Sequence, residues 1–200
     1  MTRRHEILRE MGLTPVWRLR KEQVVEEVRE ETGWIELKRA VPACTACGLH
    51  KTRANTVLGV GDEQADWLFI GEAPGAEEDR TGEPFVGQAG KLLDNMLAAI
   101  GLNRSENVYI CNVLKCRPPG NRNPEPEEVA KCSPHLAKQI ALIQPKLIVA
   151  MGRFAAQTLL NSDASIASLR GRLHQYAGVP LIVTYHPAYQ IGRASCRERV

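Results

Sequence analysis

The stretch WLFIGEAPG, residues 67–75, decides the fold of this chain. Its first half is a short apolar run, which predicts a buried strand, and its glycines and proline predict a tight turn directly after that strand. Three more apolar runs follow, VYICNVLK, KLIVAMG and PLIVTYHP, and helical segments separate them: AGKLLDNMLAAIG, PEEVAKC with PHLAKQIALI, and RFAAQTLL. This alternation predicts an α/β fold of three layers, with helices on both faces of a central four-stranded parallel sheet.

Polar residues collect at the carboxyl ends of the four predicted strands, where open α/β sheets bind their ligands. The strand ends are GEAPG (71–75), NVLKCRPPGNR (112–122), GR (152–153) and HPAY (186–189). Each is weak evidence when taken singly, because GEAPG could be only a turn and a histidine after a strand is more often structural. Since all four ends meet at one edge of the sheet, together they predict a binding or catalytic site.

The composition fits a globular chain with one main domain. Of the 200 residues 44% are hydrophobic, and the formal charge of +3 is too small to indicate a nucleic-acid partner by itself. The first forty residues are rich in charge and contain no long apolar run. We therefore expect a helical accessory segment over residues 1–40, no signal peptide, no membrane span and a cytoplasmic location.

Two glycine-rich stretches lack the features of nucleotide sites. GVGDEQ (59–64) has no third glycine of a dinucleotide-binding fingerprint. GQAGKL (87–92) lacks the leading glycine spacing of a P-loop and the serine or threonine that follows its lysine. The sequence therefore indicates no nucleoside triphosphate site.

The stretch ACTACGLHKTR contains Cys44 and Cys47, separated by two residues. Six cysteines in a chain expected in a reducing compartment indicate a metal, a cluster or catalysis before disulfides. Cys111 falls inside an apolar strand, where a buried thiol is expected, whereas Cys116 and Cys132 flank a loop and a helix start. We predict one site built from Cys44, Cys47, Cys116 and Cys132. Spacing alone leaves tetrahedral zinc and an iron–sulfur cluster open.

Three motifs together resemble the uracil-DNA glycosylase superfamily, and specifically its iron–sulfur family 4: GEAPGAEEDRTGEPFVGQAGKLLDNML, NVLKCRPPGNRNP and HPAY. The resemblance spans about residues 40 to 190 and includes the four cysteines. It implies a glycosylase domain over residues 41–190, a 4Fe-4S cluster with a structural role, and an enzyme of base excision repair. The implied reaction is hydrolysis of the N-glycosidic bond of uracil in DNA, which releases uracil and leaves an abasic site.

By this resemblance, Phe85 stacks on a uracil that has been flipped out of the duplex, and Asn112 pairs its carboxamide with uracil O4 and N3. A carboxamide offers a donor and an acceptor, whereas cytosine presents the opposite pattern, so Asn112 would select against cytosine. We expect the Phe85 side chain to be exposed. Gly71 and Ala73 complete the expected substrate-binding set.

The resemblance assigns catalysis to His186 and Glu72. His186 would donate to uracil O2 as negative charge develops on the leaving base, and a neutral imidazole suffices for this. The best-known branch of the superfamily has a water-orienting aspartate where this chain has Ala73, and a thymine-excluding aromatic where it has Gly75. Glu72 is therefore expected to position the water or to stabilise the cationic sugar, and thymine exclusion is assigned to no residue.

Basic residues near the predicted strand ends are expected to contact DNA phosphates. They are Lys115, Arg117 and Arg122 around the third cysteine of the site, Arg153 after the third strand, and Arg170 and Arg172 in SLRGRLH. Scattered basic residues are also common on any solvated surface, so this assignment depends on the resemblance. The expected partner is uracil-containing DNA, single- or double-stranded, bound by a monomer.

Three alternatives compete with this interpretation. A related branch that becomes covalently attached to DNA has a histidine in a KRRIH insertion, whereas this chain has CRPPGNRNPEPEE. A non-catalytic nucleic-acid-binding module, stabilised by zinc or a cluster, would not need His186. An electron carrier would have no use for a Phe, Asn and His set at the strand ends. Iron–sulfur absorbance and uracil excision discriminate between them.

The last ten residues, IGRASCRERV, resemble the conceptual translation of a common sequencing adapter. We therefore expect the natural sequence to diverge after Gln190, residues 191–200 to be a non-native tail, and Cys196 not to be a ligand. A DNA-inserting loop and a terminal helix of the family would then be missing. This predicts a less stable chain that acts poorly on duplex DNA, with single-stranded DNA less affected.

Overall fold

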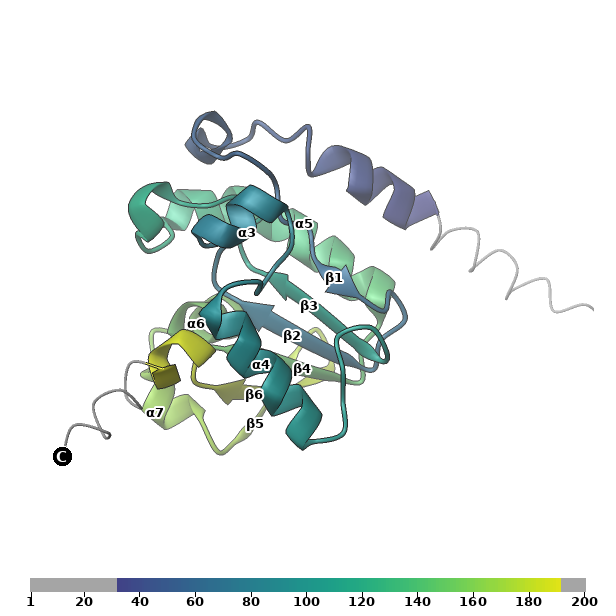
Figure 1. Ribbon diagram of the computed structural model, residues 1–200. Helices are drawn as coiled ribbons and strands as arrows, with labels where there is room; N and C mark the ends of the chain where they lie inside the picture. Colours follow the sequence, from purple (N-terminus) through teal and green to yellow (C-terminus); the bar gives the residue numbers. More distant parts are fainter. Residues whose placement is uncertain (1–31, 192–200) are drawn as a thin grey trace, which may run out of the picture. The chain divides into compact units, whose positions relative to one another are not determined.

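Six strands form one sheet in the computed structural model, which describes residues 32–191 (Figure 1). Their order across the sheet is β1-β3-β2-β4-β6-β5. The strands are β1 (Val60–Gly61), β2 (Trp67–Gly71), β3 (Val108–Asn112), β4 (Leu147–Met151), β5 (Leu173–Tyr176) and β6 (Val179–Thr184). Residues 1–31 of the helical segment expected over residues 1–40, and residues 192–200 of the tail expected over residues 191–200, lie outside the described residues.

The four predicted strands form the parallel centre of the sheet, β3-β2-β4-β6, which confirms the α/β class. The sequence does not predict the two edge strands, β1 and β5, which pair antiparallel with β3 and β6. β1 has only two residues, and the side chains of β5 alternate between exposed and half-buried. Neither edge strand is therefore an apolar run, and short or polar edges are the usual way in which a sheet ends.

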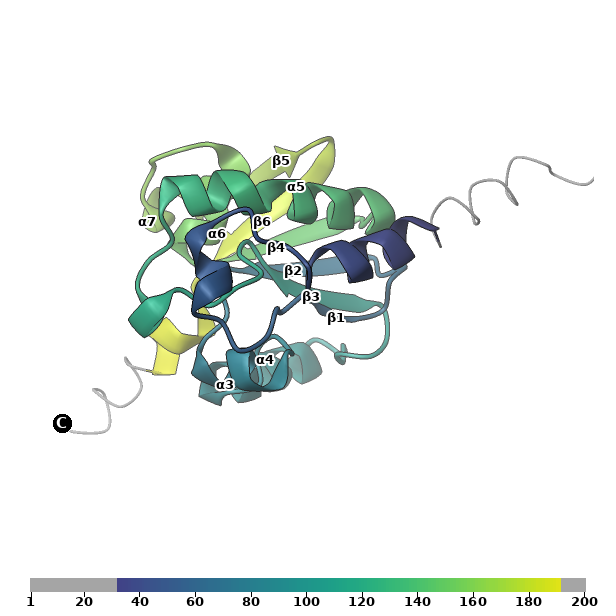
Figure 2. The ribbon, with the colours of Figure 1, turned by 90° about the horizontal axis from the view of Figure 1, so that it is seen from above.

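Helices cover both faces of the sheet. They are α3 (Ala76–Thr81), α4 (Gln88–Ala99), α5 (Pro126–Ile143), α6 (Arg153–Leu160) and α7 (Ile166–Leu169), with the 3-10 helices η1 (Gly48–Lys51) and η2 (Pro119–Asn121). Figure 2 shows α5 and α6 on one side of the sheet and α3 and α4 on the other. The predicted segments PEEVAKC and PHLAKQIALI form one helix, α5, which contains Pro134.

Alternating side chains divide the strands between two apolar cores. In β2, Leu68 and Ile70 belong to the core that α5 and α6 cover, whereas Phe69 belongs to the core that includes Leu93 and Leu97 of α4. This is the two-residue period of a strand with both faces buried. The continuous apolar runs in the sequence are explained by this double burial.

Residues 34–41 belong to the main fold. Trp34, Leu37 and Val41 lie at helical spacing and are buried in the same core as Ile140 and Ile143 of α5. The compact unit that contains these residues begins at Trp34. Within the described part of the chain, no helix combines the length and the apolar character needed to cross a bilayer.

The register of β2 and β3 places two of the strand ends side by side. Gly71 lies opposite Asn112, and the amides of Val113 and Leu114 donate to the carbonyl oxygens of Gly71 and Glu72 at 2.9 and 3.0 Å. The ends of β4 and β6 are paired in the same parallel sense. The strand ends therefore lie along one edge of the sheet, as predicted.

Candidate active site

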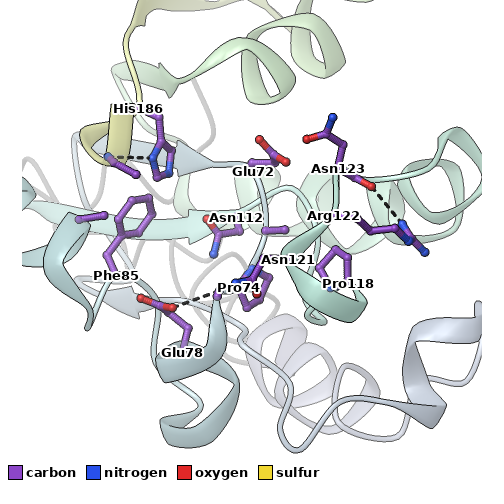
Figure 3. Close-up of a pocket in the computed structure, with 14 residues that line it drawn as sticks. Glu72, Pro74, Glu78, Phe85, Asn112, Pro118, Asn121, Arg122, Asn123 and His186 are labelled. Carbon is purple, nitrogen blue, oxygen red and sulfur yellow. Dashed lines mark hydrogen bonds between the residues drawn. The ribbon is translucent and has the colours of Figure 1, made fainter. Parts of the chain in front are cut away.

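A cavity of about 400 Å³ opens at this edge of the sheet (Figure 3). Its volume lies in the usual range for small-molecule sites. The sequence-predicted residues that line it are Glu72, Ala73, Phe85, Asn112, Arg122 and His186. Residues that the sequence analysis did not single out also line it, among them Glu78, Pro118, Asn121 and Asn123.

The carboxamide of Asn112 is a buried polar group at the end of β3. Asn112 is 2% exposed, and its Oδ1 has no hydrogen-bond partner among the described residues. Gly71 makes room for this group, because a Cβ there would overlap both Asn112 Oδ1 and the Phe85 ring. A buried acceptor without a partner is unfavourable, so a ligand that donates to it would gain binding energy.

The backbone of Phe85 is left-handed, with φ 55°, which is uncommon for an aromatic residue. The guanidinium of Arg104 stabilises this turn by donating to the carbonyl oxygens of Phe85, of Pro84 at 3.0 Å and of Gly90 at 3.4 Å. Arg104 also pairs with Asp94 of α4. A Cβ at Gly90 would overlap the Phe85 carbonyl oxygen, so the turn requires a glycine at this position.

The Phe85 ring lies between the apolar core and the cavity. Phe85 is 5% exposed and packs in the core that contains Leu93 and Ile110, so the expectation of an exposed side chain is wrong. Burial of a large apolar ring is the favourable state. The ring nevertheless lines the cavity and stacks on His186, with ring centroids 5.4 Å apart and an interplanar angle of 28°.

The carboxylate of Glu78 joins the two segments that follow β2. It accepts the amide hydrogens of Gly75 at 3.1 Å, Val86 at 3.0 Å and Gly87 at 3.1 Å. The first bond caps α3, and the other two hold the turn that contains Phe85. Glu78 is not among the residues predicted from the sequence, although a glutamate three residues after the glycine at a helix start is a recognisable capping signal.

His186 presents an imidazole that favours the neutral form. The amide of Ala188 donates to its Nδ1 at 3.2 Å, so the proton of the neutral ring belongs on Nε2. Burial lowers the pKa of His186, and the charge of Glu78 opposes this effect. The ring is therefore a single N–H donor in a largely desolvated position.

Glu72 supplies a partly buried carboxylate to the same cavity. Burial raises the pKa of Glu72, and the positive charge of Arg153 opposes this effect. Desolvation of this kind makes a carboxylate a better proton acceptor. A carboxylate in such a cavity is suited to orienting water or stabilising a cation.

The four predicted cysteines line a second, smaller cavity, so the fold brings Cys44, Cys47, Cys116 and Cys132 together from three segments. Burial raises the pKa of Cys132 to about 11, which means that its thiolate needs a stabilising positive charge. Cys111 is fully buried in β3, as predicted. Cys196 lies outside the described residues.

The chemistry of this lining suits a metal centre. Four thiolates can ligate either a tetrahedral zinc ion or the four irons of a 4Fe-4S cluster. All four thiols border the same cavity, which is compatible with both groups.

Comparison with known proteins supplies the family. Residues 58–198 match the family described as the Uracil DNA glycosylase superfamily. The chain belongs to this superfamily. A Type-4 uracil-DNA glycosylase of Archaeoglobus fulgidus is 50% identical over 171 residues, which cover 82% of this chain and 85% of that protein.

Two more relatives place the chain in the type-4 branch. The Type-4 uracil-DNA glycosylase of Thermotoga maritima is 47% identical over 84% of this chain and 87% of its own length. That of Sulfurisphaera tokodaii is 43% identical over 82% of this chain and 78% of its own length. The resemblance of the three sequence motifs to family 4 is confirmed.

The basic residues expected to contact DNA differ in accessibility. The expectation is wrong for Lys115, which is 1% exposed and donates from Nζ to the Asn112 carbonyl oxygen at 2.6 Å. The chain turns inward after β3 and takes this side chain into the interior. Arg122 lines the first cavity and is paired with Glu128 and Glu125.

The other basic residues of this set are exposed, except for the half-buried Arg117. Arg117 donates to Asn121 Oδ1 at 2.7 Å, and the exposed Arg170 lies over the ring of Tyr185. Arg153 and Arg172 are exposed. Their contact with DNA stays a prediction.

Gly90→Ala tests the constraint on the Phe85 turn. Alanine in place of glycine within a helix ordinarily adds about 0.5–1 kcal/mol of stability. We expect Gly90→Ala instead to lose roughly 1–3 kcal/mol, because its methyl group overlaps the Phe85 carbonyl oxygen. Urea unfolding measures the difference.

Gly48→Ala is the control, since a Cβ at Gly48 would meet no atom within 4 Å. It should unfold at the same urea concentration as the unaltered chain or a higher one. A Gly90→Ala variant that is as stable as this control would contradict the constraint.

Proposed function

We propose that this chain hydrolyses the N-glycosidic bond of uracil in DNA, releasing free uracil and leaving an abasic site as the first step of base excision repair. The observation that supports this most directly is the unpartnered, buried carboxamide oxygen of Asn112 in a cavity with an aromatic ring and a neutral imidazole. The type-4 relatives, which match most of this chain, have the name uracil-DNA glycosylase.

Base recognition is assigned to Asn112 and Phe85. The target nucleotide is extruded from the DNA, so that its base enters the cavity and stacks on the Phe85 ring. Asn112 Oδ1 accepts the uracil N3 hydrogen, and Asn112 Nδ2 donates to O4. Cytosine presents an acceptor and a donor in the opposite order, so it leaves both polar atoms of Asn112 unsatisfied. Gly71 and Ala73 shape the wall beside the base.

His186 is assigned to the leaving base. When the bond between C1′ and N1 breaks, its electron pair passes to uracil and negative charge develops on O2. The Nε2 hydrogen of His186 donates to this oxygen, and preorganised donors of this kind lower barriers by about 3–4 kcal/mol. Because burial favours the neutral imidazole, the donor is present without a full charge that would bind the ground state.

Glu72 is assigned to the sugar. The deoxyribose gains positive charge as the base departs, and a carboxylate beside it stabilises that charge. The same carboxylate can orient the water that attacks C1′ and accept its proton. The raised pKa of Glu72 favours this proton transfer.

We propose a 4Fe-4S cluster held by Cys44, Cys47, Cys116 and Cys132. The lining of one cavity by all four thiols supports it, as does the similarity of the chain to the type-4 relatives. Bound there, the cluster would cross-link the segments that bear the cysteines, and hydrolysis requires no electron transfer. A non-catalytic zinc-stabilised module is less favoured, because it would not need Asn112, His186 and Glu72 in one cavity.

The proposed substrate is uracil in single- or double-stranded DNA, bound by a monomer in the cytoplasm. The half-buried Arg117 and the exposed Arg170 and Arg172 would contact phosphates, while Arg122 lines the base cavity. Phosphate contacts of this kind make affinity fall as salt rises.

His186→Ala should lower the single-turnover excision rate roughly 100- to 1,000-fold, because its donor acts on charge that develops in the transition state. Affinity for uracil-containing DNA should change only a few-fold. Release of uracil from an oligonucleotide with one uracil measures the rate. Absence of excision by the unaltered chain on both single- and double-stranded DNA would reject the proposed function, and an unaltered rate in His186→Ala would reject the role of His186.

Asn112→Asp should relax base selection, since a protonated or ionised carboxyl group offers a different donor and acceptor set. We expect excision of cytosine to appear while part of the uracil activity remains. Matched oligonucleotides with one uracil or one target cytosine compare the two rates. Asn112→Ala is the control and should excise neither uracil nor cytosine. Full uracil excision by that variant would show that Asn112 does not recognise the base.

The proposed role of Glu72 predicts that the excision rate falls at acidic pH. The carboxylate is the active form, so excision proceeds above the pKa of Glu72 and is lost as the pH falls through it. Burial raises that pKa, which places the loss at a higher pH than for an ordinary glutamate. Glu72→Gln should lower the rate at neutral pH roughly 100- to 10,000-fold and remove the fall at acidic pH. A fall that persists in Glu72→Gln belongs to another group.

A further inference from the structure

The cysteine cavity is surrounded by basic groups. Apart from the four thiols, its polar lining consists of Arg53, Lys115, Lys131, His50 and His135. No aspartate or glutamate lines it. Surroundings of this kind stabilise a negatively charged group.

Lys115 is the buried member of this set. It is 1% exposed, whereas Lys131 lies at the surface. The hydrogen bond from its Nζ goes to the backbone carbonyl oxygen of Asn112, and none of the ion pairs formed by residues 32–191 includes it. A buried ammonium that has no opposite charge is strongly unfavourable. No carboxylate among the described residues pairs with the Lys115 ammonium. Its opposite charge must therefore come from another kind of group.

Lys115 and Arg53 both bond to the segments that bear the cysteines. The backbone amide of Lys115 donates to Cys132 Sγ at 3.3 Å. The Arg53 guanidinium donates to Cys116 Sγ at 2.9 Å and to the carbonyl oxygen of Cys44 at 3.0 Å. Hydrogen bonds and charges near ligating sulfurs tune both the retention of a cluster and its reduction potential.

We propose that the buried ammonium of Lys115 is the counter-ion of the cluster, and that Arg53 adds a second positive charge beside Cys116. The inference rests on the proposed 4Fe-4S cofactor, whose four thiolates leave an excess of negative charge. Because the same ammonium bonds the Asn112 carbonyl oxygen, Lys115 also connects the cluster site to the strand end that bears the base-recognising carboxamide. Lys115 is thus a positioning residue.

Lys115→Met and Lys131→Met form a matched pair. Each removes one positive charge from the lining of the cysteine cavity, but only the first removes a buried charge. The variants are purified with their cluster. Three quantities are measured: iron per chain, the chelator concentration that removes half of the cluster absorbance, and the reduction potential by voltammetry.

In Lys115→Met, the chelator concentration that removes half of the cluster absorbance should be roughly 10- to 100-fold lower than in the unaltered chain. The reduction potential of this variant should become more negative, because a nearby positive charge favours the reduced cluster. Lys131→Met should resemble the unaltered chain in both respects, since solvent screens an exposed charge. Lys115→Arg, which keeps the charge, should return the potential toward that of the unaltered chain.

An unchanged potential in folded Lys115→Met overturns the proposal, since a merely structural lysine would alter thermal stability without moving the potential. An equal shift in Lys131→Met overturns it as well. If Lys115→Met does not accumulate as folded protein, Arg53→Gln provides the test, because Arg53 is partly exposed. That variant must weaken cluster retention and shift the potential in the same direction, and no shift overturns the proposal.

The unaltered chain separates this inference from the proposed function. A chain without iron and without iron–sulfur absorbance refutes the cofactor and the counter-ion together. If the unaltered chain holds the cluster but Lys115→Met and Lys131→Met have the same cluster retention and the same reduction potential, only the counter-ion role of Lys115 is refuted. Uracil excision by the unaltered chain is measured independently of both.

Discussion

The parallel pairing of β2 with β3, with Gly71 opposite Asn112, is the constraint on which both cavities depend. It brings Glu72 and Asn112 to the same cavity, and the missing side chain of Gly71 leaves room for the Asn112 carboxamide and for the Phe85 ring. Hydrogen bonding between the two segments continues past the strands, through the amides of Val113 and Leu114. A slip of one residue would turn the polar groups away from the cavity.

The segment that follows β3 links the two cavities. Asn112 lines the first, and Lys115 and Cys116 line the second. A second link passes through Asp79 of α3, whose carboxylate accepts the amide hydrogens of Ala54 and Asn55, close to the paired cysteines in sequence. The two cavities are therefore parts of one hydrogen-bonded structure.

Sequence patterns predict what depends on neighbours along the chain. The four parallel strands and the residues at their ends were accessible in this way, because apolar runs and turn residues are local signals. Lys115 shows the limit: beside a cysteine and an arginine it resembles a surface residue, and only the path of the chain after β3 makes it buried. The contacts of Arg104 with the Phe85 turn depend on segments 19 residues apart, so no local pattern contains them.

The short segment between Asn112 and Cys116 also limits how the chain length can vary. Three residues separate these two positions. The sheet fixes Asn112, and the cysteine cavity fixes Cys116. An inserted or deleted residue here would break one attachment or the other. The loop that follows is exposed around Gly120, whose φ of 63° suits a surface turn. Length differences among relatives should therefore accumulate in that loop and be absent from the segment before it.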